Sequence, residues 1–165
     1  MPLIIEDGTG VEDANTYIDL ADARELASTR GIILSAEDSE LSSQLVSAAD
    51  RLTSYEARMT GCRMTGAQGL SYPRNNSYRY GSIFPNTSIP KELKLAQVTL
   101  AGLMESGVII WGLPATGIKS ETVGPLETVY TDSGADSVGN PDLPQIDSIL
   151  EPLFISLGLN FKVGR

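Results

Sequence analysis

Hydrophobic side chains recur at helical spacing in four stretches of the chain. An early helix is predicted to begin after Asp19 and to stop at Gly31, with three apolar positions on one face: Ala23, Leu26 and Ala27. A longer one is predicted to begin at Ser35, which forms a capping pattern with Asp38, and it has an apolar stripe of six residues: Leu41, Leu45, Ala48, Ala49, Leu52 and Tyr55. These patterns predict two amphipathic helices before residue 60.

Two further helices are predicted in the second half of the chain. The third has Pro90 in its first turn and runs to about Ile110, and it is apolar around most of its girth, which is typical of a central helix. The last contains Pro152, which should kink or divide it, and its apolar face has six members: Ile146, Ile149, Leu150, Leu153, Phe154 and Leu157.

The remaining segments lack helical spacing. Residues 3–5 read as a short strand that ends in a turn-forming run, and residues 60–89 form a loop of about thirty residues rich in Gly, Pro and Asn. Extended patterns at 118–123 and 126–130 flank Gly124-Pro125, which is not a usual hairpin turn, so a kinked arm is favoured over a tight hairpin. The expected fold is mainly α: a small bundle of about four helices, with an extended β arm or hairpin and a long central loop.

The whole chain, residues 1–165, is expected to form a single domain. Residues 115–141 are predicted to be the β arm and its linker, and residues 142–165 a C-terminal docking helix and tail. The start of the chain lacks the features of a signal peptide, and its longest apolar stretch, 107–114, is too short to span a bilayer. We therefore expect a protein that stays in the cytosol unless an assembly carries it elsewhere.

The composition excludes several kinds of chemistry. The chain has no histidine and one cysteine, Cys62, so it cannot form a Ser-His-Asp or Cys-His pair, a His-ligated metal site or an internal disulfide. The run Gly8-Thr9-Gly10 lacks the remaining residues of a nucleotide-binding loop and reads as a turn. The sequence predicts no catalytic, cofactor or metal site, and we expect the protein not to be an enzyme.

The net charge of −9 is unevenly distributed along the chain. Residues 57–104 hold six basic and one acidic side chain, whereas residues 1–56 hold 3 basic and 12 acidic ones and residues 105–165 hold 3 and 8. The overall acidity argues against a surface that grips nucleic acid. A basic middle between acidic ends suits self-association, although ordinary scatter of surface charge is an equal alternative.

The long loop combines arginines with aromatic residues, the types enriched at protein interfaces. A single-strand platform, with rings that stack on bases and arginines that hold phosphates, is the alternative, and a protein–protein contact is preferred. With the arm and the last helix, the predicted interface residues are Tyr72, Arg74, Tyr78, Arg79, Val123, Gly124, Pro125, Leu126, Leu153, Phe154 and Leu157.

Four sequence blocks, in register over residues 3–153, resemble a family of small tailed-bacteriophage proteins that often carry the label DnaT-like single-stranded-DNA-binding protein. The blocks are Ile4-Ile5-Glu6-Asp7-Gly8-Thr9-Gly10 with Ala14-Asn15-Thr16-Tyr17-Ile18, then Gly69-Leu70-Ser71-Tyr72-Pro73-Arg74, Ile89-Pro90, and Ser120-Glu121-Thr122-Val123-Gly124-Pro125-Leu126. Tyr72 stands where the family often has Trp. The last block also resembles a segment of phage head-to-tail connector proteins.

The resemblance implies a virion structural protein: a head-to-tail adaptor, or head-completion protein, that forms a ring between portal and tail. Such proteins usually assemble as a twelve-subunit ring, extend the DNA channel and offer a docking surface for the tail. The implied partners are other copies of the chain, the portal protein and a tail or neck protein, with packaged DNA passing through without specific binding and no membrane or cofactor involved. The implied location is the virion neck, after assembly in the host cytoplasm. The alternative is a single-stranded-DNA-binding replication accessory protein.

Overall fold

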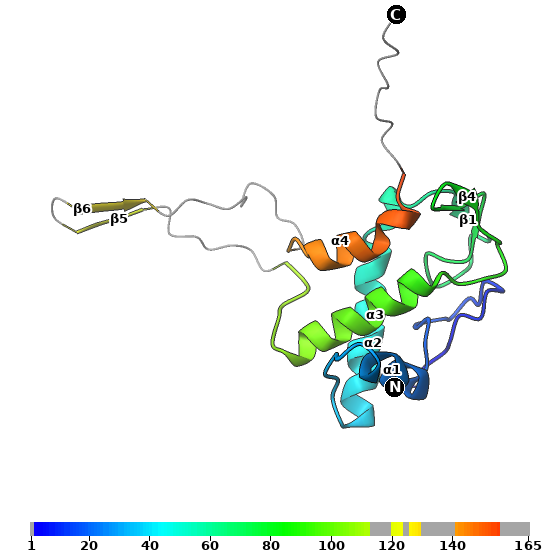
Figure 1. Cartoon of the computed structure of the whole chain (residues 1–165), viewed down its shortest axis with the longest axis horizontal. Helices are drawn as coiled ribbons and strands as arrows, with labels where there is room; N and C mark the ends of the chain where they lie inside the picture. Colours follow the sequence, from blue (N-terminus) through cyan, green and yellow to red (C-terminus); the bar gives the residue numbers. More distant parts are fainter. Residues whose placement is uncertain (1, 113–119, 124–125, 130–140, 156–165) are drawn as a thin grey trace, which may run out of the picture.

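The computed structural model describes residues 2–112, 120–123, 126–129 and 141–155. Within these residues the body is built from four helices: α1 (Leu20–Ser28), α2 (Asp38–Thr53), α3 (Lys91–Glu105) and α4 (Pro144–Leu150). Two single 3₁₀ turns, η1 (Glu56–Arg58) and η2 (Glu151–Leu153), follow α2 and α4. The fold is mainly α with a hairpin (Figure 1), as the sequence predicts.

Helix α3 is the centre of the body, because α1, α2 and α4 all pack against it. Its buried side chains belong to two hydrophobic clusters. One lies between α2, α3 and α4 and includes Leu52, Leu93 and Leu150, and the other lies between α1, α2 and α3 and includes Ala23 and Leu45. A helix buried on several sides must be apolar around most of its circumference, and this explains the sequence pattern of α3.

Two of the helix starts are set by different groups. Asp19 caps α1 as predicted, because its carboxylate accepts a hydrogen bond from the backbone N–H of Asp22. The predicted Ser35 cap of α2 is wrong, because Glu37 occupies the N-cap position without a side-chain cap. The Ser35 hydroxyl donates instead to the Glu40 carboxylate at 2.8 Å, so it fastens the connecting segment to the first turn.

The ends of α3 and α4 follow from glycine and proline. Pro90 precedes α3 as its N-cap residue, and the helix ends at Glu105 rather than near Ile110. Gly107, at φ +80°, makes the left-handed turn in which the N–H groups of Gly107 and Val108 donate to the carbonyls of Met104 and Leu103. The predicted division of the last helix at Pro152 is confirmed, since α4 gives way to η2 there.

The segment before α1 is a loop rather than a strand. The strand predicted at residues 3–5 is reduced to one isolated bridge between Ile5 and Thr16. The Glu6 carboxylate is buried and accepts hydrogen bonds from the backbone N–H groups of Gly8, Gly10 and Val11 at 2.8–2.9 Å. These bonds hold residues 6–11 in a compact turn, while the N–H of Ile4 donates to the side chain of Asn15 and not to a neighbouring strand.

The loop predicted at residues 60–89 contains two small antiparallel sheets. Strand β1 (Cys62–Arg63) pairs with β2 (Arg74–Asn75), and β3 (Tyr78–Arg79) pairs with β4 (Ser82–Ile83). Strands of two residues are too short to produce a visible period in the sequence, which is why the prediction missed them.

The predicted arm contains a third two-stranded sheet, β5 (Ser120–Val123) with β6 (Leu126–Val129). Figure 1 shows this hairpin to one side of the helices. Val123 pairs with Leu126, so two residues connect the strands, and the expected kinked arm is corrected to a tight hairpin. In the described part of the chain, no helix has the length and hydrophobicity needed to cross a bilayer.

Candidate functional site

The arginines of the central loop are held by carboxylates of the same molecule. Glu56, in η1, accepts hydrogen bonds from Arg63 at 2.6 and 2.8 Å and from Arg74 at 3.1 Å. The Arg63 bonds, together with those from Arg74, lower the pKa of the Glu56 carboxyl below its ordinary value of 4.5. Arg74 also donates to the backbone carbonyls of Thr60 and Gly61. The bonds of Glu56 therefore connect η1 to β1, which contains Arg63, and to β2, which contains Arg74.

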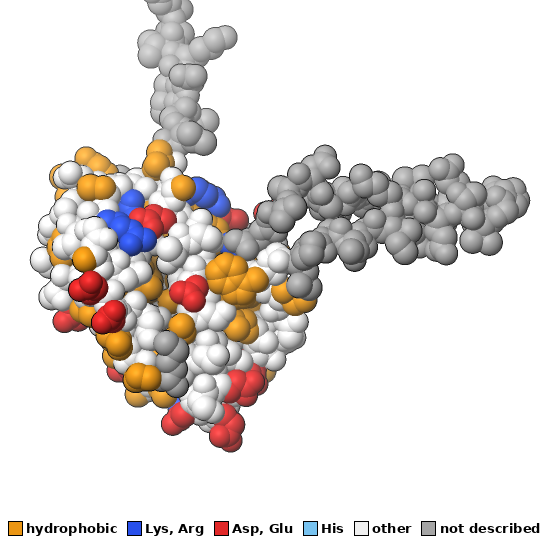
Figure 2. Space-filling model, turned by 180° about the vertical axis from the view of Figure 1, so that it is seen from behind, with side chains coloured by type: hydrophobic (Ala, Val, Ile, Leu, Met, Phe, Trp, Pro, Cys, Tyr) orange, Lys and Arg blue, Asp and Glu red, His pale blue; other side chains and the backbone are white. Residues whose placement is uncertain are grey.

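The other two arginines of this segment are paired as well. Arg58 contacts the Asp147 carboxylate of α4, and Arg79 contacts the Glu92 carboxylate of α3 at 2.8 Å. Figure 2 shows Lys and Arg side chains lying directly beside Asp and Glu side chains on one face of the molecule. The positive charge that the sequence places in residues 57–104 is therefore largely balanced within the chain.

Three of the predicted interface side chains lie inside the molecule. Tyr72 and Leu153 are fully buried, and Arg74 is 5% exposed. The Tyr72 backbone N–H donates to the hydroxyl of Tyr17, another core residue. The expectation that these three side chains meet a partner at the surface is corrected: they stabilise the loop and the core.

The remaining predicted residues are less enclosed. Tyr78 is 45% exposed, the Arg79 side chain is 26% exposed, and Phe154 is partly buried beneath the Arg58 guanidinium, which lies 4.1 Å from the centre of its ring. Val123 and Leu126 pair in the β5–β6 hairpin. Gly124, Pro125 and Leu157 lie outside the described residues.

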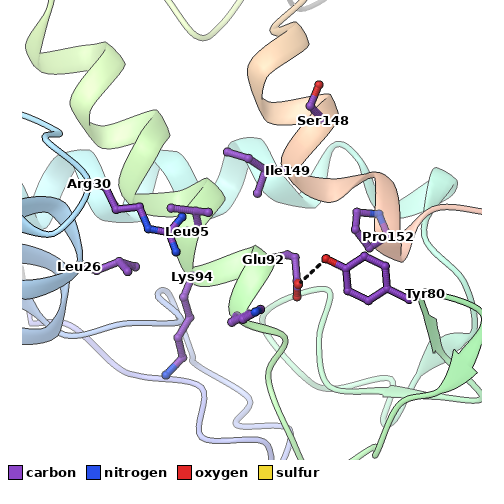
Figure 3. Close-up of a pocket in the computed structure, with 10 residues that line it drawn as sticks. Leu26, Arg30, Tyr80, Glu92, Lys94, Leu95, Ser148, Ile149 and Pro152 are labelled. Carbon is purple, nitrogen blue, oxygen red and sulfur yellow. Dashed lines mark hydrogen bonds between the residues drawn. The ribbon is translucent and has the colours of Figure 1, made fainter.

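A groove of about 450 Å³ lies where α1, α3, the α4–η2 segment and the residue after β3 meet. Figure 3 shows Leu26 and Arg30 at one end of it, Tyr80 and Pro152 at the other, and the side chains of α3 between them. The floor is mixed in character, with Leu95 and Ile149 as apolar members and Glu92 as the acidic one.

The charged residues of this groove differ from the other cations of the molecule. Five of the nine Lys and Arg side chains that the structure describes form salt bridges, and a sixth, Arg51, bonds to hydroxyls and a backbone carbonyl. The other three, Arg30, Lys91 and Lys94, have no carboxylate partner among the described residues, and all three line this groove. The unneutralised positive charge of the described surface is therefore concentrated at one place.

Tyr80 forms the rim of the groove. Its side chain is 70% exposed, its backbone lies in the left-handed region at φ +51°, and its N–H donates to the Pro152 carbonyl of η2 at 3.2 Å. The Tyr80 hydroxyl lies 3.5 Å from one carboxylate oxygen of Glu92 (Figure 3), which is a weak contact. An exposed ring beside free cations is an arrangement that can hold an anionic chain carrying flat groups.

Sequence reasoning did not find the groove cations, because Arg30 is some sixty residues from Lys91 and Lys94 in the chain. One signal was available. Lys91 and Lys94 occupy the first turn of α3, where a positive charge opposes the helix dipole and is unfavourable by a few tenths of a kcal/mol. Such a placement suggests a role outside helix stability.

The remaining candidate chemistry is sparse. Cys62 is exposed and free, and the described residues contain no cluster of three or more side chains placed to hold a metal ion.

The chain matches a known sequence family. A family model described as "Putative DnaT-like ssDNA binding protein" matches residues 1–165. The chain belongs to this family. No curated protein and no solved structure matches it.

Two of the sequence blocks that resemble this family meet in the structure. A Cβ atom on Gly69 would lie 2.5 Å from the Ala14 carbonyl oxygen, so only glycine permits the two segments to approach so closely. The hydrogen bond between Tyr17 and the Tyr72 backbone joins the same two blocks. These two blocks therefore specify how the central loop packs on the segment before α1. The residues that line the groove lie outside both blocks.

Proposed function

We propose that this protein binds single-stranded DNA in the groove between α1, α3 and the α4–η2 segment. The observation that carries the proposal is that Arg30, Lys91 and Lys94, the described cations without an acidic or internal partner, line one groove beside the exposed Tyr80. The family description supports the same function.

The groove offers the two kinds of contact that single strands need. The cations would hold backbone phosphates, and the Tyr80 ring would stack on a base, as aromatic side chains do on other single-strand platforms. A base in a duplex is already stacked on both faces, so this arrangement favours single-stranded over double-stranded DNA.

The acidity of the whole protein sets the expected strength of binding. A net charge of −9 repels DNA at low ionic strength over long distances, whereas at about 0.1 M salt charges more than about 10 Å from the strand are largely screened. The groove cations act at contact distance and are screened less. We expect weak, salt-sensitive binding with little long-range steering.

The proposed role is binding without catalysis. A single-strand-binding replication accessory protein needs no cofactor and no nucleophile, and the contacts named above are sufficient for it.

Fluorescence anisotropy with a labelled single strand of mixed sequence tests the proposal. Lys94→Ala should weaken binding and reduce the slope of log K against log salt by about 0.7, because one phosphate contact is lost. Tyr80→Ala should weaken binding about tenfold, because one stacked base is lost. Arg24→Ala is the matched control, since it removes one positive charge that is already paired with Asp38 outside the groove.

Two results would contradict the proposal. One is the absence of saturable binding by the wild-type protein at low salt. The other is an equal loss of affinity in Arg24→Ala and Lys94→Ala, which would mean that net charge, not the groove, governs binding.

A second candidate is the head-to-tail adaptor of a virion neck, for which the comparisons give no support. The observation that favours it is a run of exposed apolar side chains, Val108, Ile109 and Trp111, between the end of α3 and the hairpin. Exposed apolar runs of this kind suit contacts between subunits. In this candidate the copies form a ring that contacts a portal protein and a tail protein, after assembly in the host cytoplasm.

Analytical ultracentrifugation and electron microscopy with a portal protein test the adaptor. A ring that binds the portal supports it. A monomer that does not bind the portal contradicts the adaptor. If that monomer still binds single-stranded DNA, single-strand binding is the proposal that remains.

A further inference from the structure

The Glu92 carboxylate is the one acidic group among the residues that line the groove, and one of its two oxygens has no hydrogen-bond partner. Glu92 is 5% exposed. One of its oxygens, Oε1, accepts hydrogen bonds from Arg79 at 2.8 and 3.2 Å and lies near the Tyr80 hydroxyl. The other, Oε2, is buried and has no hydrogen-bond partner. A buried carboxylate oxygen without a donor is unfavourable, so Oε2 has an unused capacity to accept a hydrogen bond from a ligand.

The surroundings of the carboxylate in the groove suggest which kind of donor would reach Oε2. Figure 3 shows the Glu92 carboxylate facing the Tyr80 hydroxyl at the end of the groove. The contact between them is long, 3.5 Å, and Tyr80 is 70% exposed, so a turn of the ring away from the carboxylate would give up this weak contact and the contact of the ring with the Arg79 guanidinium, 5.4 Å from its centre. A base that stacks on the turned ring would bring the groups at its edge toward Glu92.

We propose that Glu92 selects bases that carry an exocyclic amino group, above all cytosine over thymine; this inference rests on the proposed single-strand binding. With Oε1 occupied by Arg79, the carboxylate has one oxygen left to accept an N–H. A recessed acceptor is reached by a donor that projects from the ring edge, such as the amino group of cytosine or adenine. Thymine projects carbonyl oxygens from both sides of its only N–H, and these would meet the carboxylate oxygen first.

The Arg79 contact also explains why an acidic group can stand in a DNA-binding groove. The salt bridge balances the Glu92 charge, so the carboxylate repels nearby phosphates little, while Oε2 keeps its capacity to accept a hydrogen bond. The groove cations then determine the affinity for the DNA backbone, and Glu92 determines which bases are preferred.

The test compares labelled oligo-dC and oligo-dT of equal length, which differ little in ring size. Wild-type protein should bind oligo-dC about tenfold more tightly, because one hydrogen bond to a charged acceptor is gained. Glu92→Gln should abolish or reverse this preference, since the amide oxygen would take the Arg79 contacts and its NH₂ group, a donor to thymine O4, would stand in place of Oε2. Glu12→Gln is the matched control for lost negative charge, because Glu12 is exposed and lies outside the groove.

Each outcome decides something. Equal binding of oligo-dC and oligo-dT by the wild type overturns the inference and leaves single-strand binding intact, whether or not Glu92→Gln folds. A cytosine preference that persists in folded Glu92→Gln also overturns it. Failure to bind either strand contradicts the proposed function itself.

Discussion

Arg74 and Arg30 carry the same charge but have opposite surroundings. Arg74 is buried and bonds to Glu56 and to three backbone carbonyls, those of Thr60, Gly61 and Ser71. Arg30 is exposed, and the described residues give it no carboxylate partner. At the scale of single residues, the internal partners of Arg74 give it a structural role, whereas Arg30 stays available for the proposed binding of DNA.

Glu56 should stabilise the fold in a pH-dependent way. Glu56→Gln should lower the free energy of unfolding at neutral pH by about 2 kcal/mol, because two arginines lose a charged acceptor. The folded-state pKa of Glu56 lies below 4.5, so this contribution is complete above 4.5 and is lost as the pH falls through the folded-state value.

Urea denaturation of both proteins across acidic pH measures the effect. The difference in free energy of unfolding between wild type and Glu56→Gln should shrink as the pH falls below 4.5. A difference that stays constant down to strongly acidic pH would contradict this assignment. Glu12→Gln, which removes an exposed carboxylate without a described side-chain partner, should change stability by less than about 0.5 kcal/mol.

At the scale of elements, the central loop is ordered by close contacts and not by long strands. Its two sheets have strands of two residues, too few to hold a segment of this length. Backbone contacts supply the rest: Gly69 lies against the Ala14 carbonyl, and Gly61 lies against the Asn75 carbonyl. The loop therefore depends on glycines at particular positions.

Two glycines of this loop form a matched pair for testing that dependence. A Cβ on Gly69 would lie 2.5 Å from the Ala14 oxygen and 2.8 Å from the Glu12 oxygen, whereas a Cβ on Gly66 would meet nothing within 4 Å. Gly69→Ala should lower the free energy of unfolding by about 2 kcal/mol, because backbone must shift. Gly66→Ala should be neutral or slightly stabilising. Thermal denaturation followed by circular dichroism measures both, and similar melting temperatures for the two variants would count against the close packing.

At the scale of the whole molecule, η2 joins the helical body to the central loop. Two backbone hydrogen bonds make the connection: Thr60 N–H to the Leu153 carbonyl at 3.0 Å and Tyr80 N–H to the Pro152 carbonyl at 3.2 Å. Beside them, the N–H of Ile155, which follows η2, donates to the Arg58 carbonyl of η1 at 2.8 Å. The groove lies along this junction, so its shape depends on the docking of α4 and η2.

Leu153 is the side chain that should anchor this junction. Leu153→Ala should lower the free energy of unfolding by about 3 kcal/mol, because a fully buried leucine is replaced by a cavity. Ile155→Ala, at a side chain 54% exposed, should change it by less than about 1 kcal/mol. Urea denaturation measures both, and a neutral Leu153→Ala would support the surface docking role first predicted for this residue.

Much of the helical fold is predictable from the sequence, because periodic burial leaves a periodic pattern. Helices α1, α2 and α3 appear at their expected places, and Pro152 divides the last helix as expected. Errors occur at the ends, such as the overextension of α3, where the left-handed turn at Gly107 outweighs the apolar residues that follow. Local groups decide helix ends, and several nearby residues can supply them.

The candidate site, unlike the helices, could not be predicted from the sequence. A mainly α domain, an acidic chain without histidine, and a basic, tyrosine-rich middle segment can all be read from the sequence. Which of the charges remain unpaired is visible only once the chain is folded. Ion pairs such as Arg63 with Glu56 and Arg58 with Asp147 join residues from different elements, and Arg30 reaches Lys91 and Lys94 only when α1 packs on α3. Charge composition is a property of the chain, but its neutralisation depends on distance in space, and distance is set by folding.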